Sequence, residues 1–456
     1  MKGEVTMYSA TCWQQQAAAV SRVLSRAPEI NRQLRVPQSE FARRHQAVTQ
    51  MLARHDIKVG LVYSDEHFCG DVPYLGGNTN ITIEPVAGLV GNSGFHLLAG
   101  LEGGFSVEEL GYRSGAVIHK VGLLQLADEE YPVRAERLED IVEDCAGCRP
   151  DRIALLTPKS VLPVSVYHAL RDYLGGEEYL VDLHQEYARI KNRKSLIEMQ
   201  LTQQASLISD VMLEAMLAVL RPGMLETQVA QWGYAVALEL GVEEMGFDLM
   251  VTTGVNNRTM VGKALNVPIA HGEAVHIGVA PKCDGLTSCE RVSAIALAPG
   301  EAMPQHHRFW LDLLQEGFQV GLDSYIEVAA KGLPACTQER ALVDYFVSRQ
   351  AEVERRYGKK IDMEQQKPYT GTHGGGYTEC QEFFGAITQS TREPLDEQIV
   401  TMLDVAVKGM GSYWNEQVIP GVDFYIVEKT IGKFGTQARL LNQLPVEIQQ
   451  LVGVGY

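Results

Sequence analysis

Residues 275–291 read VHIGVAPKCDGLTSCER, and this stretch carries the most informative pattern in the chain. Apolar residues on one side of Gly285 and a short polar run on the other predict two strands joined across a glycine-containing turn. Gly278 lies in the first predicted strand. Glu290 and Arg291, an acid followed by a base, lie at the end of the second predicted strand. The stretch therefore predicts a hairpin that brings charged side chains to one place.

The composition is that of an ordinary globular protein, with 45% hydrophobic and 21% charged residues in a chain of 456. This length predicts two domains rather than one small core. The formal charge of −17 argues against a nucleic-acid partner, because a protein that follows the phosphate backbone should be basic. No apolar run reaches the roughly 20 residues that span a bilayer, so we expect no membrane partner.

The beginning of the chain lacks the layout of a secretory signal, which predicts a cytoplasmic protein. Eight cysteines in a chain of this length do not form a disulfide framework. Cys145 and Cys148 form a lone CxxC pair, and we interpret them as two reduced thiols near a loop. A zinc or redox site would need a second pair or a thioredoxin-like context.

The pattern along the chain divides into three parts. Residues 1–35 are polar and rich in Ala and Gln, which predicts a helical arm on the surface or at a subunit contact. Residues 36–185 alternate helical and strand-like runs, as in a compact α/β domain. A polar segment near 183–195 is typical of a linker. Residues 190–456 combine long helices with strands and glycine turns, so the predicted fold class is α+β.

Six ordered segments of the second domain resemble the motifs of the M24 family, which includes methionine aminopeptidase, aminopeptidase P, prolidase and creatinase. They are Lys194 and Glu198 in a KSxxE pattern, Arg221–Glu226, Thr253–Asn256, Gly272–Val275, Thr372–Gly376 and Gly421–Leu441. The resemblance covers roughly 250 residues. It implies a creatinase-type N-terminal domain followed by a pita-bread catalytic domain. It also implies a homodimer in which the N-terminal domain lies near the partner's active site.

The resemblance implies a set of ligand positions that this chain fills only in part. Metal-dependent members use two Asp, one His and two Glu around a dinuclear centre of Mn, Co, Fe or Zn. The corresponding residues here are Gly278, Cys289, His373, Leu403 and Glu428. Asp404 stands next to Leu403, and a further family histidine corresponds to Cys380. Neighbouring residues of a strand point to opposite faces, so an adjacent carboxylate is no automatic substitute.

Creatinase has this scaffold and works without metal, and Glu290-Arg291 resembles its Glu-Arg pair. Its carboxylates bind a guanidinium in fork geometry while a histidine moves the proton. The position of that histidine falls near Val261 here, so His271, His276 and His373 are the candidates for the base.

We therefore expect a hydrolase or lyase without cofactor that cleaves a C–N or related bond of a small nitrogen-containing molecule. His373, Glu290 and Glu428 are the candidate catalytic residues. The candidate substrate-binding residues are Arg291, Asp404, Glu382, Cys289 and Cys380.

Two other functions fit the same sequence. A metal-dependent Xaa-Pro-type aminopeptidase or dipeptidase would use Glu290, His373, Asp404 and Glu428 as ligands of Mn, Fe, Co or Zn. A pita-bread domain that has lost catalysis would act as a binding module.

Overall fold

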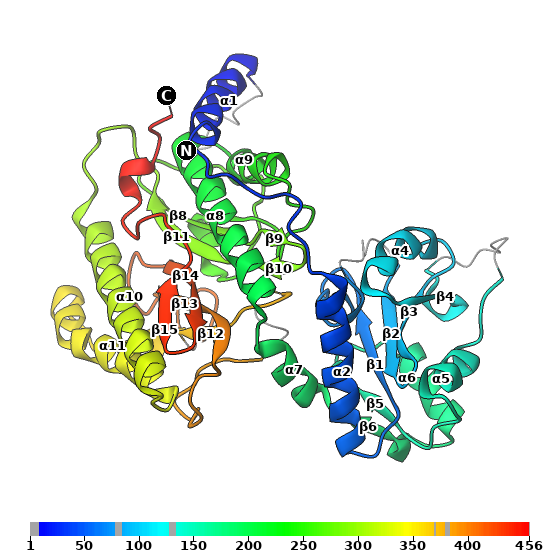
Figure 1. Cartoon of the computed structure of the whole chain (residues 1–456). Coiled ribbons are helices and arrows are strands. Elements are labelled where there is room, and N and C mark those ends of the chain that lie inside the picture. Colours follow the sequence, from blue (N-terminus) through cyan, green and yellow to red (C-terminus); the bar gives the residue numbers. More distant parts are fainter. Residues whose placement is uncertain (1–8, 78–83, 127–133, 369–370, 379–383, 456) are drawn as a thin grey trace.

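The computed structural model describes residues 9–77, 84–126, 134–368, 371–378 and 384–455. Two sheets organise these residues, and Figure 1 shows them side by side with the long helix α8 beside the second sheet. None of the described helices is long and apolar enough to cross a membrane.

The first sheet has six strands in the order β4-β3-β2-β1-β5-β6. The β1-β2 and β2-β3 pairs are antiparallel, and the outer pairs are parallel. The strands are β1 (Val59–Ser64), β2 (Val86–Gly91), β3 (Gly94–Ala99), β4 (Val117–Lys120), β5 (Ile153–Leu155) and β6 (Leu180–Asp182). The associated helices are α2 (Gln38–Arg54), α3 (Asp71–Gly76), α4 (Gly104–Gly111), α5 (Leu138–Ala146), α6 (Val164–Leu174) and α7 (His184–Asn192). Most strand residues are buried, as expected for a sheet covered on both faces.

The second sheet has seven strands in the order β12-β13-β14-β11-β8-β7, with β15 paired to β14. All of its pairs are antiparallel. Its strands are β7 (Met250–Thr253), β8 (Ala274–Val279), β11 (Glu290–Ile295), β12 (Thr372–Gly374), β13 (Gln398–Lys408), β14 (Phe424–Phe434) and β15 (Gln437–Leu440). The small hairpin β9 (Lys282–Cys283) and β10 (Leu286–Thr287) joins β8 to β11. The predicted hairpin at 275–291 is therefore present.

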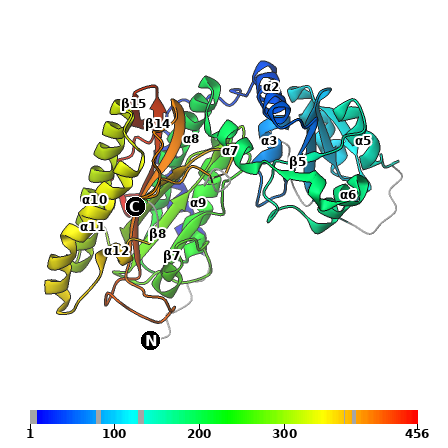
Figure 2. The same ribbon diagram turned by 90° about the horizontal axis from the view of Figure 1, so that it is seen from below.

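Helices cover one face of the second sheet. Figure 2 shows α10 (Gln305–Lys331) and α11 (Cys336–Tyr357) along β14 and β15, with α8 (Leu196–Val219) and α9 (Glu226–Glu239) farther along the sheet. On β13, Leu403 and Val405 belong to the apolar core beneath α10 and α11. Because side chains alternate along a strand, Asp404 points to the opposite face. The candidate site lies on that uncovered face.

Helix α8 begins where the sequence provides a capping box. The Ser195 hydroxyl accepts from the Glu198 N–H, and the Glu198 carboxylate accepts from the Ser195 N–H. The helix α1 (Ala10–Leu24) packs on α8, and its residues Ala19, Val20 and Val23 are buried. The predicted N-terminal arm is thus helical but is held against its own chain.

Residues 184–192, part of the predicted linker, form helix α7. Lys191 forms a buried ion pair with Asp71, and the Tyr187 hydroxyl donates to the Asp71 carbonyl at 2.7 Å. These contacts with a distant helix stabilise α7, which explains why its polar sequence was misleading.

The buried Arg44 of α2, in the N-terminal domain, contacts two residues of the C-terminal domain. Its guanidinium donates to the Tyr377 hydroxyl at 2.8 Å and lies 3.1 Å from the Glu198 carboxylate of α8. Tyr377 lies four residues after His373, so the N-terminal part of the chain contacts the segment that carries the candidate base.

Candidate active site

Three strands of the second sheet place a guanidinium between two carboxylates. Arg291 of β11 pairs with Glu428 of β14, which pairs in turn with Asp404 of β13. The Arg291 Nη1 lies 3.3 Å from Oε2 of Glu428 and 3.4 Å from Oδ2 of Asp404. The three side chains are no more than 4% exposed. Buried charges persist only when they are paired, and these three form a connected group.

The remaining donors of Arg291 also have partners. Nε donates to Nε2 of His276 at 3.1 Å, and Nη2 donates to the Met260 carbonyl. Burial and the Arg291 charge lower the pKa of the His276 imidazole well below 6.5, so this ring is neutral and can accept. Arg291 is therefore a fixed internal cation, and His276 orients it.

Arg291, Glu428 and Asp404 form a row of side chains across adjacent strands, and His373, on the short strand β12, extends this row. Its Nε2 lies 3.4 Å from Oε1 of Glu428, and its Nδ1 lies 3.3 Å from the Gly374 carbonyl oxygen. A Cβ atom at Gly375 would lie 2.6 Å from the Met402 side chain, so glycine permits the close approach of this loop to β13. At 15% exposure, the His373 side chain is the most accessible part of the group.

Glu428 is ionised despite its burial. Burial alone would raise its pKa, but the hydrogen bond with His373, the Arg291 charge and the hydrogen bond with Cys289 together lower it below 4.5. The thiol of Cys289 therefore lies next to the Glu428 carboxylate. Together, these side chains place the His373 imidazole, oriented by Glu428, beside two carboxylates that share the positive charge of Arg291.

One atom from each of His373, Asp404 and Glu428 could bind a metal ion, since these atoms lie within 4.8 Å of one another. The dinuclear centre implied by the family resemblance does not fit these residues. Gly278 supplies no ligand, and a Cβ atom there would lie 3.0 Å from Cγ of Arg291 and 3.3 Å from Sδ of Met250. The Arg291 side chain thus occupies the space in front of that position. Among the residues that the structure describes, this donor set fits a single ion next to a fixed positive charge.

Glu290, a candidate catalytic residue and alternative metal ligand, does not lie in this group. It forms an ion pair with Lys429, and Asn442 donates to its other oxygen at 3.4 Å. Lys429 lies on the helix-covered face, opposite Arg291 and Glu428, because neighbouring strand residues alternate. Asn442 also contacts Ser206 and Ser209 of α8 on that face. The expectation that Glu290 shares a site with His373 is therefore corrected.

Replacing Glu290 by glutamine is expected to flatten the pH dependence of stability. Burial, opposed by the Lys429 charge, raises the pKa of Glu290 from 4.5 to about 8. Between these values the folded state binds more protons than the unfolded chain, so the free energy of unfolding falls as pH rises. The slope is at most about 1.4 kcal/mol per pH unit. Urea denaturation across this pH range measures it.

The matched control for that measurement is Glu327→Gln, which removes an exposed carboxylate of α10. This variant should keep the wild-type slope. An equal slope in Glu290→Gln and wild type would contradict the burial argument.

The assignment on β13 is also corrected. Leu403, placed by sequence at a ligand position, packs in the core beneath the helices. Asp404 is the residue that lies opposite Glu428, on the face of the sheet that α10 and α11 do not cover. The sequence did contain a signal for this arrangement. Each of two neighbouring strands has an acid next to a base, Glu290-Arg291 and Glu428-Lys429. Because side chains alternate, Arg291 can pair with Glu428 on one face of the sheet and Glu290 with Lys429 on the other.

Glu382 and Cys380 fall outside the described residues, so their predicted roles stay predictions. His271 is exposed and pairs with Glu301 at 2.7 Å, away from the row. The sequence did not indicate that His276 would accept from Arg291, or that the Met260 carbonyl would bind the same guanidinium.

Several solved structures have the same fold over most of this chain. The prolidase from Pyrococcus horikoshii OT3 is 15% identical, with a TM-score of 0.67, covering 89% of this chain and 99% of its own. The X-Pro aminopeptidase from Thermotoga maritima MSB8 is 15% identical, with a TM-score of 0.66, covering 88% and 98%. Dipeptidase PepE from Mycobacterium ulcerans is 17% identical, with a TM-score of 0.65, covering 91% and 98%. No curated protein matches the sequence.

Residues 200–422 match the model of metallopeptidase family M24. The C-terminal part of the chain therefore belongs to this family. The predicted α+β architecture with a pita-bread domain is confirmed. The prediction of a hydrolase-type enzyme is confirmed as a class, without its reaction or substrate.

Proposed function

We propose that this protein is a metal-independent M24 hydrolase or lyase that cleaves a C–N or related bond of a small nitrogen-containing molecule. The observation that carries the proposal is the Arg291 guanidinium, which ion-pairs with Asp404 and Glu428. It lies against Gly278, where metal-dependent members have an aspartate. In this proposal, an internal cation takes over the charge balance that metal ions provide elsewhere in the family.

The geometry suggests how the chain's own residues would act. Glu428 orients the His373 imidazole and would stabilise the imidazolium formed when the ring takes a proton. Cys289 and Asp404 would provide further polar contacts with the substrate. Arg291 fills the fork between the two carboxylates, so a substrate guanidinium would not bind there as it does in creatinase. We infer that the substrate contacts the row from the His373 side.

One specific observation favours a second candidate, a peptidase with a single metal ion. His373, Asp404 and Glu428 have a donor set of one imidazole and two carboxylates that suits Mn, Fe, Co or Zn. In such an enzyme Arg291 would have to coexist with the ion or move aside. The homodimer and the cytoplasmic location stay predictions.

Removing metal separates the two candidates. We expect the purified protein to lack stoichiometric transition metal and to keep its full turnover after dialysis against a chelator. Guanidino compounds, amino-acid derivatives and dipeptides would be screened first by thermal shift and then for turnover.

Turnover that is lost on chelation and restored by Mn or Zn would contradict the metal-independent proposal. Binding of several compounds with turnover of none would favour the binding module instead.

A further inference from the structure

A lysine of hairpin β9-β10 and a cysteine of the N-terminal domain are in direct contact, and neither belongs to the group formed by Arg291, Asp404, Glu428 and His373. Nζ of Lys282 lies 2.9 Å from Sγ of Cys69. Lys282 belongs to β9 of the second sheet, whereas Cys69 lies in the segment between β1 and α3 of the first sheet. The Lys282 side chain is 2% exposed. Cys69 is only half-buried, so it is closer to solvent than Lys282.

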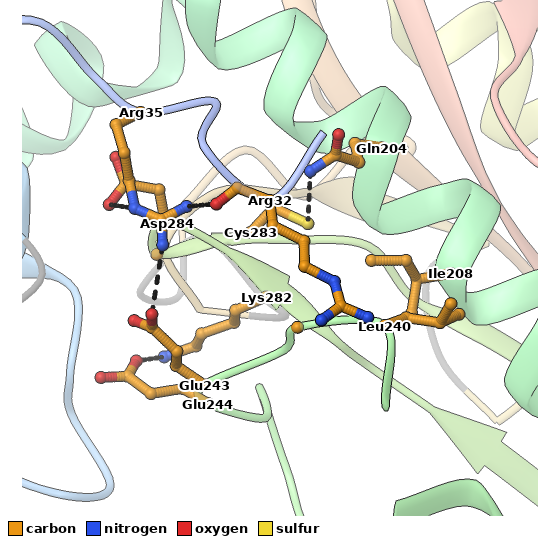
Figure 3. Close-up of a pocket in the computed structure, with 12 residues that line it drawn as sticks. Arg32, Arg35, Gln204, Ile208, Leu240, Glu243, Glu244, Lys282, Cys283 and Asp284 are labelled. Carbon is orange, nitrogen blue, oxygen red and sulfur yellow. Dashed lines mark hydrogen bonds and ion pairs between the residues drawn. The ribbon is translucent and has the colours of Figure 1, made fainter. Parts of the chain in front are cut away.

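The Glu244 carboxylate lies next to the Lys282 amine. Oε2 of Glu244 lies 3.1 Å from Nζ of Lys282, and Figure 3 shows this contact at the edge of a pocket lined by Arg35, Gln204 and Asp284. Burial would lower the pKa of Lys282, but Cys69 and Glu244 raise it overall, so the reduced pair contains an ammonium group. Glu244 is the natural acceptor if that group must lose a proton.

The chain also contains an exposed pair of the same type. Nζ of Lys58 lies 3.1 Å from Sγ of Cys148, but Lys58 is fully exposed. An exposed lysine loses side-chain conformational entropy when a reaction fixes it in one position. The buried Lys282 side chain is already fixed by its neighbours in the folded protein. The two pairs therefore differ in preorganisation rather than in chemistry.

We propose that Cys69 and Lys282 are a modification site that hydrogen peroxide converts into a covalent sulfur–nitrogen crosslink. In the first step the Cys69 thiol is oxidised to a sulfenic acid, and peroxide is reduced to water. In the second step the Lys282 nitrogen attacks that sulfur, the S–N bond forms and the S–O bond breaks. Before the attack, the Lys282 ammonium gives one proton to Glu244, so that the nitrogen is a neutral amine. A second N–H proton goes to the departing hydroxide, which leaves as water. The linked product has lost two hydrogen atoms relative to the reduced pair.

The crosslink would join the two sheets near the candidate active site. Lys282 is the first residue of hairpin β9-β10, and the Thr287 N–H of β10 donates to the Gly376 carbonyl at 2.8 Å. Gly376 lies three residues after His373. Oxidation would therefore fix the segment around Cys69 to the hairpin that supports the His373 loop.

Peptide mapping of the full-length protein tests the proposal. Reduced protein is treated with a few equivalents of hydrogen peroxide, alkylated and digested with trypsin. We expect a linked peptide that contains Cys69 and Lys282, is lighter by two hydrogen atoms, shows no cleavage after Lys282, and disappears on reduction with dithiothreitol. In Lys282→Arg we expect no link and a sulfenic acid at Cys69 that dimedone traps. Cys148→Ser should give the same linked peptide as wild type.

Three results would overturn the proposal. A disulfide between Cys69 and Cys283 instead of the link also removes two hydrogen atoms, but it would leave Cys283 without the alkyl group and would let trypsin cleave after Lys282. Oxidation of Cys69 to sulfinic acid without any link would show that the amine does not react. Equal linkage of Lys58 to Cys148 would show that the buried setting confers no selectivity.

Discussion

Replacing Arg291 by alanine is expected to destabilise the protein by about 3–5 kcal/mol at neutral pH, the usual cost of removing one partner from a buried ion pair. Asp404 and Glu428 are paired on adjacent strands, and their shared cation would be lost. The same change opens space beside His373, Asp404 and Glu428, the three side chains that could hold a metal ion. We therefore expect Mn or Zn to raise the melting temperature of this variant and to leave that of the wild type unchanged.

Two further variants locate the effect. Arg291→Met removes the charge but keeps most of the volume, so it should be destabilised and respond less to metal than the alanine variant. Arg291→Ala combined with His373→Ala should lose the metal response, because only two carboxylates remain. A wild-type protein that metal stabilises as strongly as the alanine variant would show that Arg291 does not take the place of an ion.

The fold was predictable because its signals are local. The hairpin at 275–291, the stop of α8 before Arg221-Pro222-Gly223, and the capping residues Ser195 and Glu198 each act within a few residues of chain. Helix α7 was not predictable in this way. It depends on contacts of Tyr187 and Lys191 with Asp71, more than a hundred residues earlier.

The candidate site was predictable in its residue types but not in its arrangement. His373, Glu428, Asp404 and Arg291 were all named from sequence, and the structure brings them together. Whether Glu290 or Arg291 enters the site depends on which face of β11 the helices cover. That choice is made by α8 and by the Lys429 and Asn442 contacts, which lie far away in the sequence.

Replacing His373 by glutamine is expected to reduce kcat by about 10²–10⁴-fold, the range over which a positioned acid or base contributes. The reason is geometric, since His373 is the most exposed group of the row and its ring is oriented by Glu428. Binding should change little, so KM would remain near its wild-type value. The measurement uses a substrate identified by the screen, with kcat/KM followed against pH. Loss of one limb of the pH profile would identify the imidazole as the titrating group.

The chain offers a matched control in His271, an exposed histidine that pairs with Glu301 instead of Glu428. His271→Gln should retain wild-type kcat and its pH profile. Glu428→Gln should resemble His373→Gln in kcat, because an amide cannot stabilise an imidazolium as a carboxylate does. Wild-type turnover in His373→Gln would refute the role of this imidazole. Loss of turnover in Glu428→Gln alone would move the catalytic role to the carboxylate, where Glu428 would act directly on the substrate.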